Sequence, residues 1–293
     1  MKKKLCALLL ALIMVSALIA CESEPEYEYR ILDMTTTMFN GSVNKTEYHY
    51  DENWRLTGMT VSTDGQIQQE IAVVPDEHGN PKTFTYTMAD GTVVTEEYEN
   101  TYDAQGNLTH REVFQNGTLT STLDQTFDAE GTRLTQTVTN HAYPDGGIIT
   151  EYVYNSDGTT ASMTMTTGDL GISRIEYTYD DNGNQVRSVT TNELGTIISE
   201  TNTSYNQEGQ KTLSVDTSYD ENGVPMATSA AEYTWEGNVV TTRGINPDGS
   251  RDDNYSITEY DEAGNMIRSE IYSGDQLMTS QVCTYEKVEV PAK

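Results

Sequence analysis

The side chains in this sequence that are best suited to contact a ligand are its aromatic rings. The chain has 19 tyrosines but only four phenylalanines and two tryptophans. A tyrosine ring packs against apolar groups while its hydroxyl reaches water or a polar partner. Tyr233 and Trp235, in "AAEYTWEGN", share one face of an expected strand, and Tyr205 and Tyr260 occupy the matching position of neighbouring segments. The four rings are a candidate strip for a neutral glycan or a partner protein, or else they pack adjacent hairpins together.

A cysteine at the end of an apolar leader is the second reactive group. The chain opens with MKKK, continues with sixteen uncharged residues from Leu5 to Ala20, and reaches Leu-Ile-Ala-Cys at Cys21. This stretch resembles the bacterial lipobox, in which the cysteine is acylated before cleavage. The resemblance implies a lipoprotein signal peptide over residues 1–20, an acidic tether over residues 21–29 and one domain over residues 30–293. It also implies a palmitate-type anchor on Cys21 and an extracytoplasmic protein held at a bacterial cell membrane.

Other residue types give no pattern typical of catalysis. The histidines, His49, His78, His110 and His141, are 29 to 32 residues apart and form no metal-ligand motif. The serines lack a Gly-x-Ser-x-Gly elbow, and "DDNGN" from Asp180 to Asn184 is shorter than a calcium-binding frame. We therefore expect no enzyme activity, no cofactor and no metal, with a hydrolytic enzyme as the least favoured function.

Charge and cysteine content restrict the partners further. The net charge is −29, and without residues 1–20 the chain carries 14 basic and 46 acidic residues, a net charge of −32. Such a chain repels nucleic acid and anionic lipid, so we expect no nucleic-acid partner. Cys6 belongs to the leader and Cys21 to the anchor, which leaves Cys283 alone in "SQVCTYEKV". We expect Cys283 to be a small strand residue, since nothing nearby in sequence lowers its pKa.

Glycines recur in two interleaved series that indicate repeated hairpins. The first series has steps of 25 to 28 residues: Gly79, Gly106, Gly131, Gly158, Gly183, Gly209, Gly237 and Gly264. The second series lies about halfway between: Gly65, Gly91, Gly117, Gly146, Gly171, Gly195, Gly223, Gly249 and Gly274. Successive turns of an antiparallel meander lie on opposite edges of the sheet, so the two series are expected to mark two different edges.

The residues before each glycine distinguish the two series. Four residues before the first-series glycines stand Pro75 and then seven aromatic residues: Tyr102, Phe127, Tyr154, Tyr179, Tyr205, Tyr233 and Tyr260. In the second series only Tyr219 is aromatic at that offset. An Asp or Asn follows each of these first-series residues except Tyr233, which is followed by Thr234. The side chain of such an Asp or Asn is suited to accept a hydrogen bond from a backbone N–H.

The strands between the turns are rich in Thr, Ile, Val and Tyr, and no helical periodicity appears outside the leader. Large aliphatic residues are scarce, so two packed sheets would lack a core. We predict an all-β fold, a single-layer curved antiparallel sheet of about 18–20 strands, with a large closed β-barrel as the alternative and a sandwich third. The C-terminal edge is expected to be protected from further strand pairing by Lys287, Pro291 and Lys293.

The repeat resembles a known family. "YDAQGNL" at Tyr102, "YDDNGNQ" at Tyr179 and "YDEAGNM" at Tyr260 are similar to the motif of the YD-repeat, or Rhs-repeat, family. Looser copies begin at Phe127, Tyr154 and Tyr205, and the resemblance covers about residues 46–285. It implies hairpins aligned into one long sheet. An Asp-Pro-rich self-cleavage stretch is absent, so toxin encapsulation is not expected. "YDENGVPMAT" also resembles cell-wall glucan-binding repeats, although those contain many tryptophans.

These features together favour a non-catalytic cell-surface lipoprotein whose β-repeat surface binds a glycan or a surface protein. Its other expected contact is the membrane, through the lipid on Cys21. A purely structural or assembly role in the cell envelope is the alternative.

Overall fold

A computed structural model describes residues 27–141, 148–167 and 171–289, which form twenty β-strands of one antiparallel sheet and contain no helix. No helix in these ranges is long and apolar enough to span a membrane. Several sequence predictions lie outside the described residues: the leader, Cys21, Gly146, Pro291 and Lys293. The first strand begins at Tyr27, within the segment expected to be a tether.

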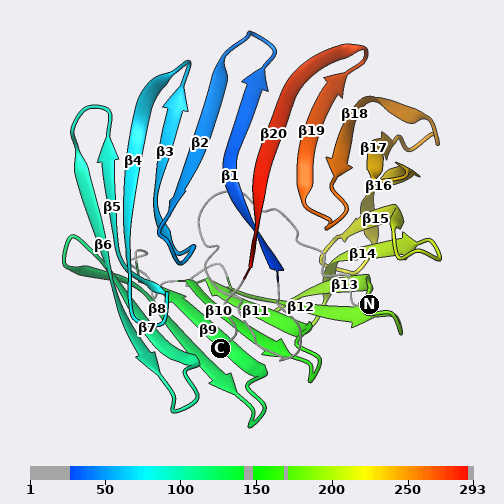
Figure 1. Cartoon of the computed structure of the whole chain (residues 1–293). Helices are drawn as coiled ribbons and strands as arrows, with labels where there is room; N and C mark the ends of the chain where they lie inside the picture. Colours follow the sequence, from blue (N-terminus) through cyan, green and yellow to red (C-terminus); the bar gives the residue numbers. More distant parts are fainter. Residues whose placement is uncertain (1–26, 142–147, 168–170, 290–293) are drawn as a thin grey trace. The chain divides into compact units, whose positions relative to one another are not determined.

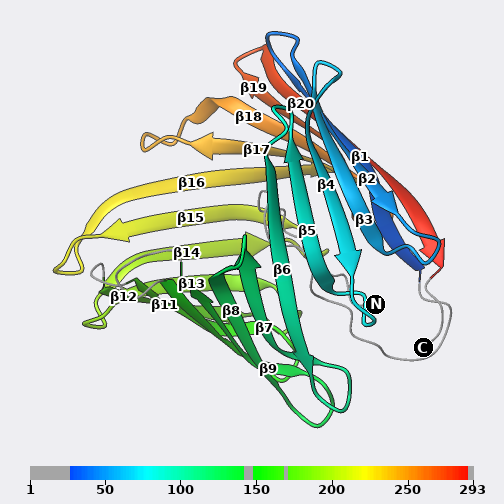
Figure 2. The ribbon, with the colours of Figure 1, turned by 90° about the vertical axis from the view of Figure 1, so that its left-hand side faces the viewer.

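The chain divides into two compact units. The terminal unit comprises residues 27–96, 235–241 and 254–289 of the described chain. Within it, consecutive strands pair side by side (Figures 1 and 2). Its strands are β1 (Tyr27–Met38), β2 (Val43–Tyr50), β3 (Leu56–Thr63), β4 (Gln66–Pro75), β5 (Pro81–Met88), most of β18 (Arg251–Tyr260), β19 (Met266–Ser273) and β20 (Gln276–Glu289).

The central unit comprises residues 97–234 and 242–253 and continues the same pattern. Its strands are most of β6 (Val93–Tyr102) and of β16 (Pro225–Glu236), with β7 (Leu108–Gln115), β8 (Thr118–Phe127), β9 (Arg133–Asn140), β10 (Ile148–Tyr154), β11 (Thr160–Thr167), β12 (Gly171–Tyr179), β13 (Gln185–Asn192), β14 (Ile197–Tyr205) and β15 (Lys211–Tyr219). The short strand β17 (Val239–Ile245) contributes residues to both units.

The two glycine series mark opposite edges within each unit, as the sequence predicts. In the terminal unit Gly79 and Gly264 lie in turns at one edge, and Gly65, Gly91 and Gly274 lie at the other. In the central unit the first edge has Gly131, Gly158, Gly183 and Gly209, and the second has Gly117, Gly171, Gly195 and Gly223. This arrangement follows from antiparallel pairing of each strand with the next one in sequence.

Most first-series turns share one hydrogen-bonded loop, shown by Asp180–Asn184. The Asp180 carboxylate accepts hydrogen bonds from the backbone N–H groups of Asn182 and Asn184, each at 2.9 Å. Gly183 has a φ of 80°, a left-handed conformation that glycine adopts without a steric penalty. The side-chain hydrogen bond from Asn184 is the main reason that the pKa of Asp180 is lowered. The turn at Gly237 differs because only Gly237 and Asn238 separate β16 from β17, which explains why Thr234 replaces the usual Asp or Asn.

The first and last strands pair with each other. Strands β1 and β20 are antiparallel from Tyr27–Glu289 to Met38–Thr279, and Figure 1 shows them side by side. The all-β, antiparallel fold class is confirmed, and this pairing is the one that its closed alternative predicts. The expected role of Lys287 at a free edge is wrong, because Lys287 is paired with Tyr29 and β20 has a neighbour on each side.

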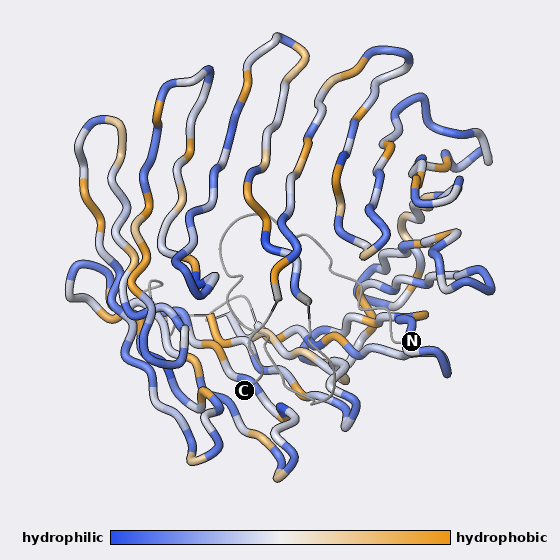
Figure 3. The backbone as a smooth tube through the Cα atoms, in the orientation of Figure 1, coloured by the Kyte–Doolittle hydropathy of each residue, from blue (hydrophilic) through white to orange (hydrophobic). Residues whose placement is uncertain are grey.

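The described residues contain few buried apolar side chains, as expected for a single layer. Those below about a tenth exposed are Val73, Leu108, Val240, Cys283 and Val288. Hydrophilic and hydrophobic residues alternate along many strands (Figure 3). Stability therefore rests mainly on strand pairing and on half-buried rings rather than on a closed apolar core.

Candidate functional site

The tyrosines that precede first-series turns lie at a fixed irregularity of the sheet. In the β12–β13 hairpin the pairs run to Thr178–Arg187, and the next pair is Tyr179–Gln185, so Val186 forms a β-bulge. The same shift occurs beside Tyr154 and Tyr205. A bulge twists the local strand and redirects its side chains. Tyr154, Tyr179 and Tyr205 therefore lie at equivalent positions just before their turns.

The hydroxyls of several of these tyrosines donate to the sheet backbone. Tyr205 donates to the carbonyl oxygen of Gln185 at 2.9 Å, and Tyr179 donates to that of Thr160 at 2.9 Å. Each acceptor is the residue paired with the preceding pre-turn tyrosine. Burial is the main cause that raises the pKa of both hydroxyls. These contacts connect each hairpin to the one before it, which is a structural role.

Tyr205 and Tyr233, two of the four predicted site residues, lie in the central unit with a lysine between them. Lys211 of β15 pairs with Tyr205, and its ammonium lies 5.3 Å from the ring centre of Tyr233. This is a cation–π distance. Both tyrosines are half-buried. Their rings and the lysine form a continuous row across β14, β15 and β16.

Trp235 and Tyr260, the other two predicted residues, lie in the terminal unit and stack on each other. Their ring centres are 6.0 Å apart with an interplanar angle of 26°. Both rings are half-buried, and burial raises the pKa of Tyr260. An offset aromatic pair of this kind is suited to contact a flat apolar face such as that of a sugar ring. Tyr205 and Tyr233 thus belong to the central unit, and Trp235 and Tyr260 belong to the terminal unit.

Sequence reasoning missed a hairpin turn because a tryptophan replaces its glycine. Trp54 has a φ of 57°, and its backbone N–H donates to the carbonyl oxygen of Asp51 at 3.0 Å, as the glycine does in the other loops. Its ring centre is 5.7 Å from that of Tyr50. The signal was present in the sequence, since Tyr50 and Asp51 precede it and Gly79 follows 25 residues later.

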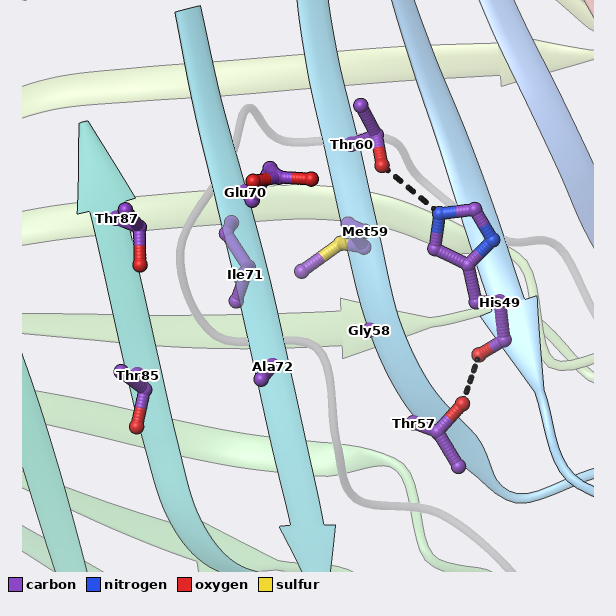
Figure 4. Close-up of a pocket in the computed structure, with 10 residues that line it drawn as sticks. All are labelled: His49, Thr57, Gly58, Met59, Thr60, Glu70, Ile71, Ala72, Thr85 and Thr87. Carbon is purple, nitrogen blue, oxygen red and sulfur yellow. Dashed lines mark hydrogen bonds between the residues drawn. The ribbon is translucent and has the colours of Figure 1, made fainter. Parts of the chain in front are cut away.

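The sheet face opposite the tyrosines has a shallow groove in each unit. In the terminal unit a groove of about 400 Å³ lies over Gly58, beside His49, Thr60 and Glu70 (Figure 4). The imidazole Nε2 of His49 is 2.9 Å from the hydroxyl oxygen of Thr60. Gly58 is buried, and a Cβ there would lie 2.6 Å from the Ile71 carbonyl oxygen, so the hollow depends on glycine. Its hydroxyl, imidazole and carboxylate groups are suited to hydrogen-bond a small polar ligand.

The groove of the central unit has an equivalent position. It has a volume of about 350 Å³ and lies over the buried Ser162, with Glu151 and Arg174 at its sides. Ser162 and Gly58 are both the third residue of the strand that follows a first-series turn. A small residue at the third position of the strand is therefore the sequence feature that could have predicted both grooves.

Two further expectations concern reactive side chains. Cys283 is a buried residue of β20, as expected, and burial is the main cause that raises the pKa of its thiol. Among residues 27–141, 148–167 and 171–289, no group of three or more His, Cys, Asp or Glu side chains is placed to hold a metal ion.

Comparison with known proteins gives no family for this chain. No family model matches it, and no curated protein matches it. Among solved structures it is similar to TcdB2-TccC3-Cdc42, with 12% identity and a TM-score of 0.37 over 85% of this chain and 15% of that one. A Photorhabdus luminescens Tc holotoxin pore has 12% identity and a TM-score of 0.35 over 88% of this chain and 15% of that one.

A porin-like protein from Bacteroides uniformis is also similar, with 12% identity and a TM-score of 0.40 over 87% of this chain and 96% of that one. The chain thus spans about 15% of the length of the two toxin chains. Membership of the YD-repeat family stays a prediction from the repeated Tyr-Asp-x-x-Gly-Asn motif.

Proposed function

We propose that this chain is a non-catalytic, lipid-anchored protein of the bacterial envelope, and that it binds a neutral glycan or the polar surface of a partner protein. The single observation that carries the binding role is the half-buried stack of Trp235 on Tyr260. The anchor rests on the lipobox-like stretch that ends at Cys21. We propose no reaction, because the sequence contains no motif that is typical of a catalytic site.

The binding test compares the aromatic stack with a tyrosine of structural role. Trp235→Ala and Tyr260→Ala should each reduce retention on purified cell-wall glycans about tenfold. Tyr179→Phe is the matched control, since it removes only a hydroxyl bond to the Thr160 backbone and should leave retention unchanged. Unchanged retention of the Trp235→Ala protein, together with a large loss of thermal stability, would show that the stack only holds strands together.

A purely structural role in the envelope is the second candidate, and one specific observation favours it. The hydroxyls of Tyr179 and Tyr205 are bonded to backbone carbonyl oxygens of the neighbouring hairpin. Tyrosines used in this way are not available for a ligand through their hydroxyls. This candidate predicts loss of stability in every pre-turn tyrosine variant and no glycan retention by the unmodified protein.

The anchor has its own test. Cells that express the chain with Cys21→Ser should incorporate no labelled palmitate into it, and the protein should leave the membrane fraction. A Cys21→Ser protein that still incorporates palmitate would contradict lipidation at this residue. Cys283→Ser is the matched control, because Cys283 is a buried strand residue and its replacement should not change labelling.

A further inference from the structure

One edge of the terminal unit carries exposed apolar side chains at every turn. This edge holds the β1–β2, β3–β4, β5–β6 and β19–β20 turns. Phe39 is 62% exposed, Ile67 is 51% exposed and Val93 is 55% exposed, and Met38, Met88 and Leu277 are 37–40% exposed. We call these six residues the apolar rim. Contiguous exposed apolar surface on a soluble protein commonly marks an interaction site.

Backbone hydrogen bonds hold neighbouring turns of the apolar rim next to each other. The N–H of Phe39 donates to the carbonyl oxygen of Met278 at 2.8 Å, which places the β1–β2 turn beside the start of β20. The N–H of Ala89 donates to the carbonyl oxygen of Gln68 at 2.8 Å, which places the β5–β6 turn beside the start of β4. Figure 1 shows these turns along one end of the strands. The turns are therefore fixed side by side, with Ile67 and Leu277 on one face of the sheet and Met38 and Met88 on the other face of the same edge.

The charges along the apolar rim are all negative. Residues 38–43, 62–68, 88–93 and 273–279 contain Asp64, Asp90 and Asp275 and no lysine, arginine or histidine. A backbone hydrogen bond from Thr92 is the main reason that the pKa of Asp90 is lowered, so this carboxyl is ionised at neutral pH. The opposite edge has cations among its acids, Arg55 and Lys82.

The position of the apolar rim separates it from the chain's own membrane. Strand β1 leads from Tyr27 at the opposite edge to Met38 at the rim. At a strand rise of about 3.3 Å per residue this distance is about 36 Å. Six residues separate Tyr27 from an anchor at Cys21, and even fully extended they span only about 20 Å, which is less than this distance. A second copy is also a poor occupant, because two acidic rims repel each other.

We propose that the apolar rim binds a cationic amphipathic segment of a partner protein. Apolar side chains of that segment would cover Phe39, Ile67 and Leu277, and its lysines or arginines would face Asp64, Asp90 and Asp275. This surface differs from the Trp235–Tyr260 stack, so the inference goes beyond the proposed function and rests on it only for the anchor at Cys21. Its basis is the coincidence of exposed apolar residues with charges of one sign.

The test uses a fluorescent synthetic peptide of alternating leucine and lysine, titrated with the purified chain and followed by anisotropy. Phe39→Ser and Ile67→Thr should each weaken binding about tenfold. Val282→Thr, at a 44% exposed position in the middle of β20, is the matched control and should not change it. Asp275→Asn should weaken binding less, and an alternating leucine–glutamate peptide should not bind.

Five results would overturn the proposal. The first is that the leucine–lysine peptide does not bind, and the second is that it binds the rim variants as tightly as the unmodified chain. The other three concern what the rim binds instead. A serine–lysine peptide binds equally well, which would reduce the effect to charge alone. Neutral phosphatidylcholine vesicles bind in a way that requires Phe39, which would make the occupant a membrane. The chain dimerises and Phe39→Ser abolishes the dimer, which would make the occupant a second copy. Glycan retention of the rim variants should stay unchanged, which separates this test from that of the proposed function.

Discussion

The junction between β20 and β1 has the same local geometry as the β12–β13 hairpin, although the two strands of the junction are at opposite ends of the sequence. In the hairpin, Tyr179 pairs with Gln185 next to a bulge. At the junction, Tyr285 pairs with Ile31, and Leu32 forms the bulge. The repeat unit therefore does not require a covalent turn in order to form.

The tyrosine contact is also reproduced at the junction. The carbonyl oxygen of Gln185 accepts from Tyr205 at 2.9 Å, and that of Ile31 accepts from Tyr50 at 2.8 Å. What replaces the missing turn is a longer pairing, with four more residue pairs from Arg30–Glu286 to Tyr27–Glu289. The comparison shows that the bulge, the tyrosine and the carbonyl acceptor occur together with or without a turn. The turn is a separate element that joins the ends of the two strands.

The strongest way to break this comparison is to remove the junction. A chain that ends at Asp275 lacks β20 and leaves both β1 and β19 without a strand partner on one side. We expect it to lose cooperative unfolding, because both pairings of β20 are lost and a domain has only about 5–15 kcal/mol of net stability. Circular dichroism during heating measures this.

The matched control is a chain that ends at Tyr285, which keeps the Tyr285–Ile31 pair and loses only the extension. It should fold with a reduced melting temperature. A chain ending at Asp275 that melts like the unmodified protein would show that the junction does not hold the sheet.

The hairpin turn should give the next largest effect. Asp180→Ala removes two hydrogen bonds to backbone N–H groups and should lower the free energy of unfolding. Asp180→Asn should cost less, because Asn206 fills the same role and accepts from Gln210 at 2.9 Å. Urea denaturation of the three proteins at one pH provides the measurement.

The same substitution tests pH dependence. The pKa of Asp180 is lowered in the folded protein, so its carboxylate stabilises the fold above the ordinary value of about 3.9 and loses this effect as the pH falls through the folded pKa. The unmodified protein should therefore lose more stability on acidification than Asp180→Asn. An identical pH profile for the two proteins would contradict the assignment.

The parts of the fold that sequence predicted are those set by local chemistry. Asp180 and Gly183 specify their turn within five residues, and the repeat places the next turn on the opposite edge. The pairing of β1 with β20 followed only from the closed alternative, and the register of Ile31 with Tyr285 was not predicted, because no local signal joins residues at opposite ends of the sequence. The turn at Trp54 was not predicted because glycine is what marks the other turns, and the loop hydrogen bonds form here without a glycine.

The candidate site was predicted less completely than the fold. Same-face spacing placed Tyr233 and Trp235 correctly on one strand, yet it gave no indication that Trp235 stacks on Tyr260 at 6.0 Å. It also gave no sign that Lys211 lies against Tyr233. Side-chain direction after a bulge and the length of each side chain decide such contacts, and neither follows from periodicity.

Removing a tyrosine hydroxyl should lower stability by a smaller amount, which should be equal at the β20–β1 junction and at the β12–β13 hairpin. Tyr50→Phe and Tyr205→Phe each remove one hydrogen bond to a backbone carbonyl and should each cost about 1 kcal/mol. Tyr29→Phe, at a 38% exposed ring, is the control and should change stability little. Chemical denaturation measures all three. A loss at Tyr205 with none at Tyr50 would mean that the junction and the hairpin are held differently.

The smallest expected effect is at Trp54, where the turn next to the junction departs from the repeat. A large side chain at a φ of 57° costs about 1–2 kcal/mol of backbone strain. The ring also packs on Tyr50, whose hydroxyl is bonded to Ile31, and an aromatic pair contributes about 0.5–1.5 kcal/mol. Trp54→Gly relieves the strain and loses the packing, so the net gain should be below about 1 kcal/mol.

Trp54→Ala separates these two contributions, because alanine loses the ring but keeps a Cβ at the left-handed position. We expect the alanine variant to be less stable than the glycine variant by about 1 kcal/mol, the usual difference at a position that requires positive φ. Equal stability of the two variants would mean that the loop relaxes to another conformation once the ring is gone. In that case the packing of Trp54 on Tyr50, and not the loop hydrogen bonds, would be what holds residue 54 in the conformation of the repeat.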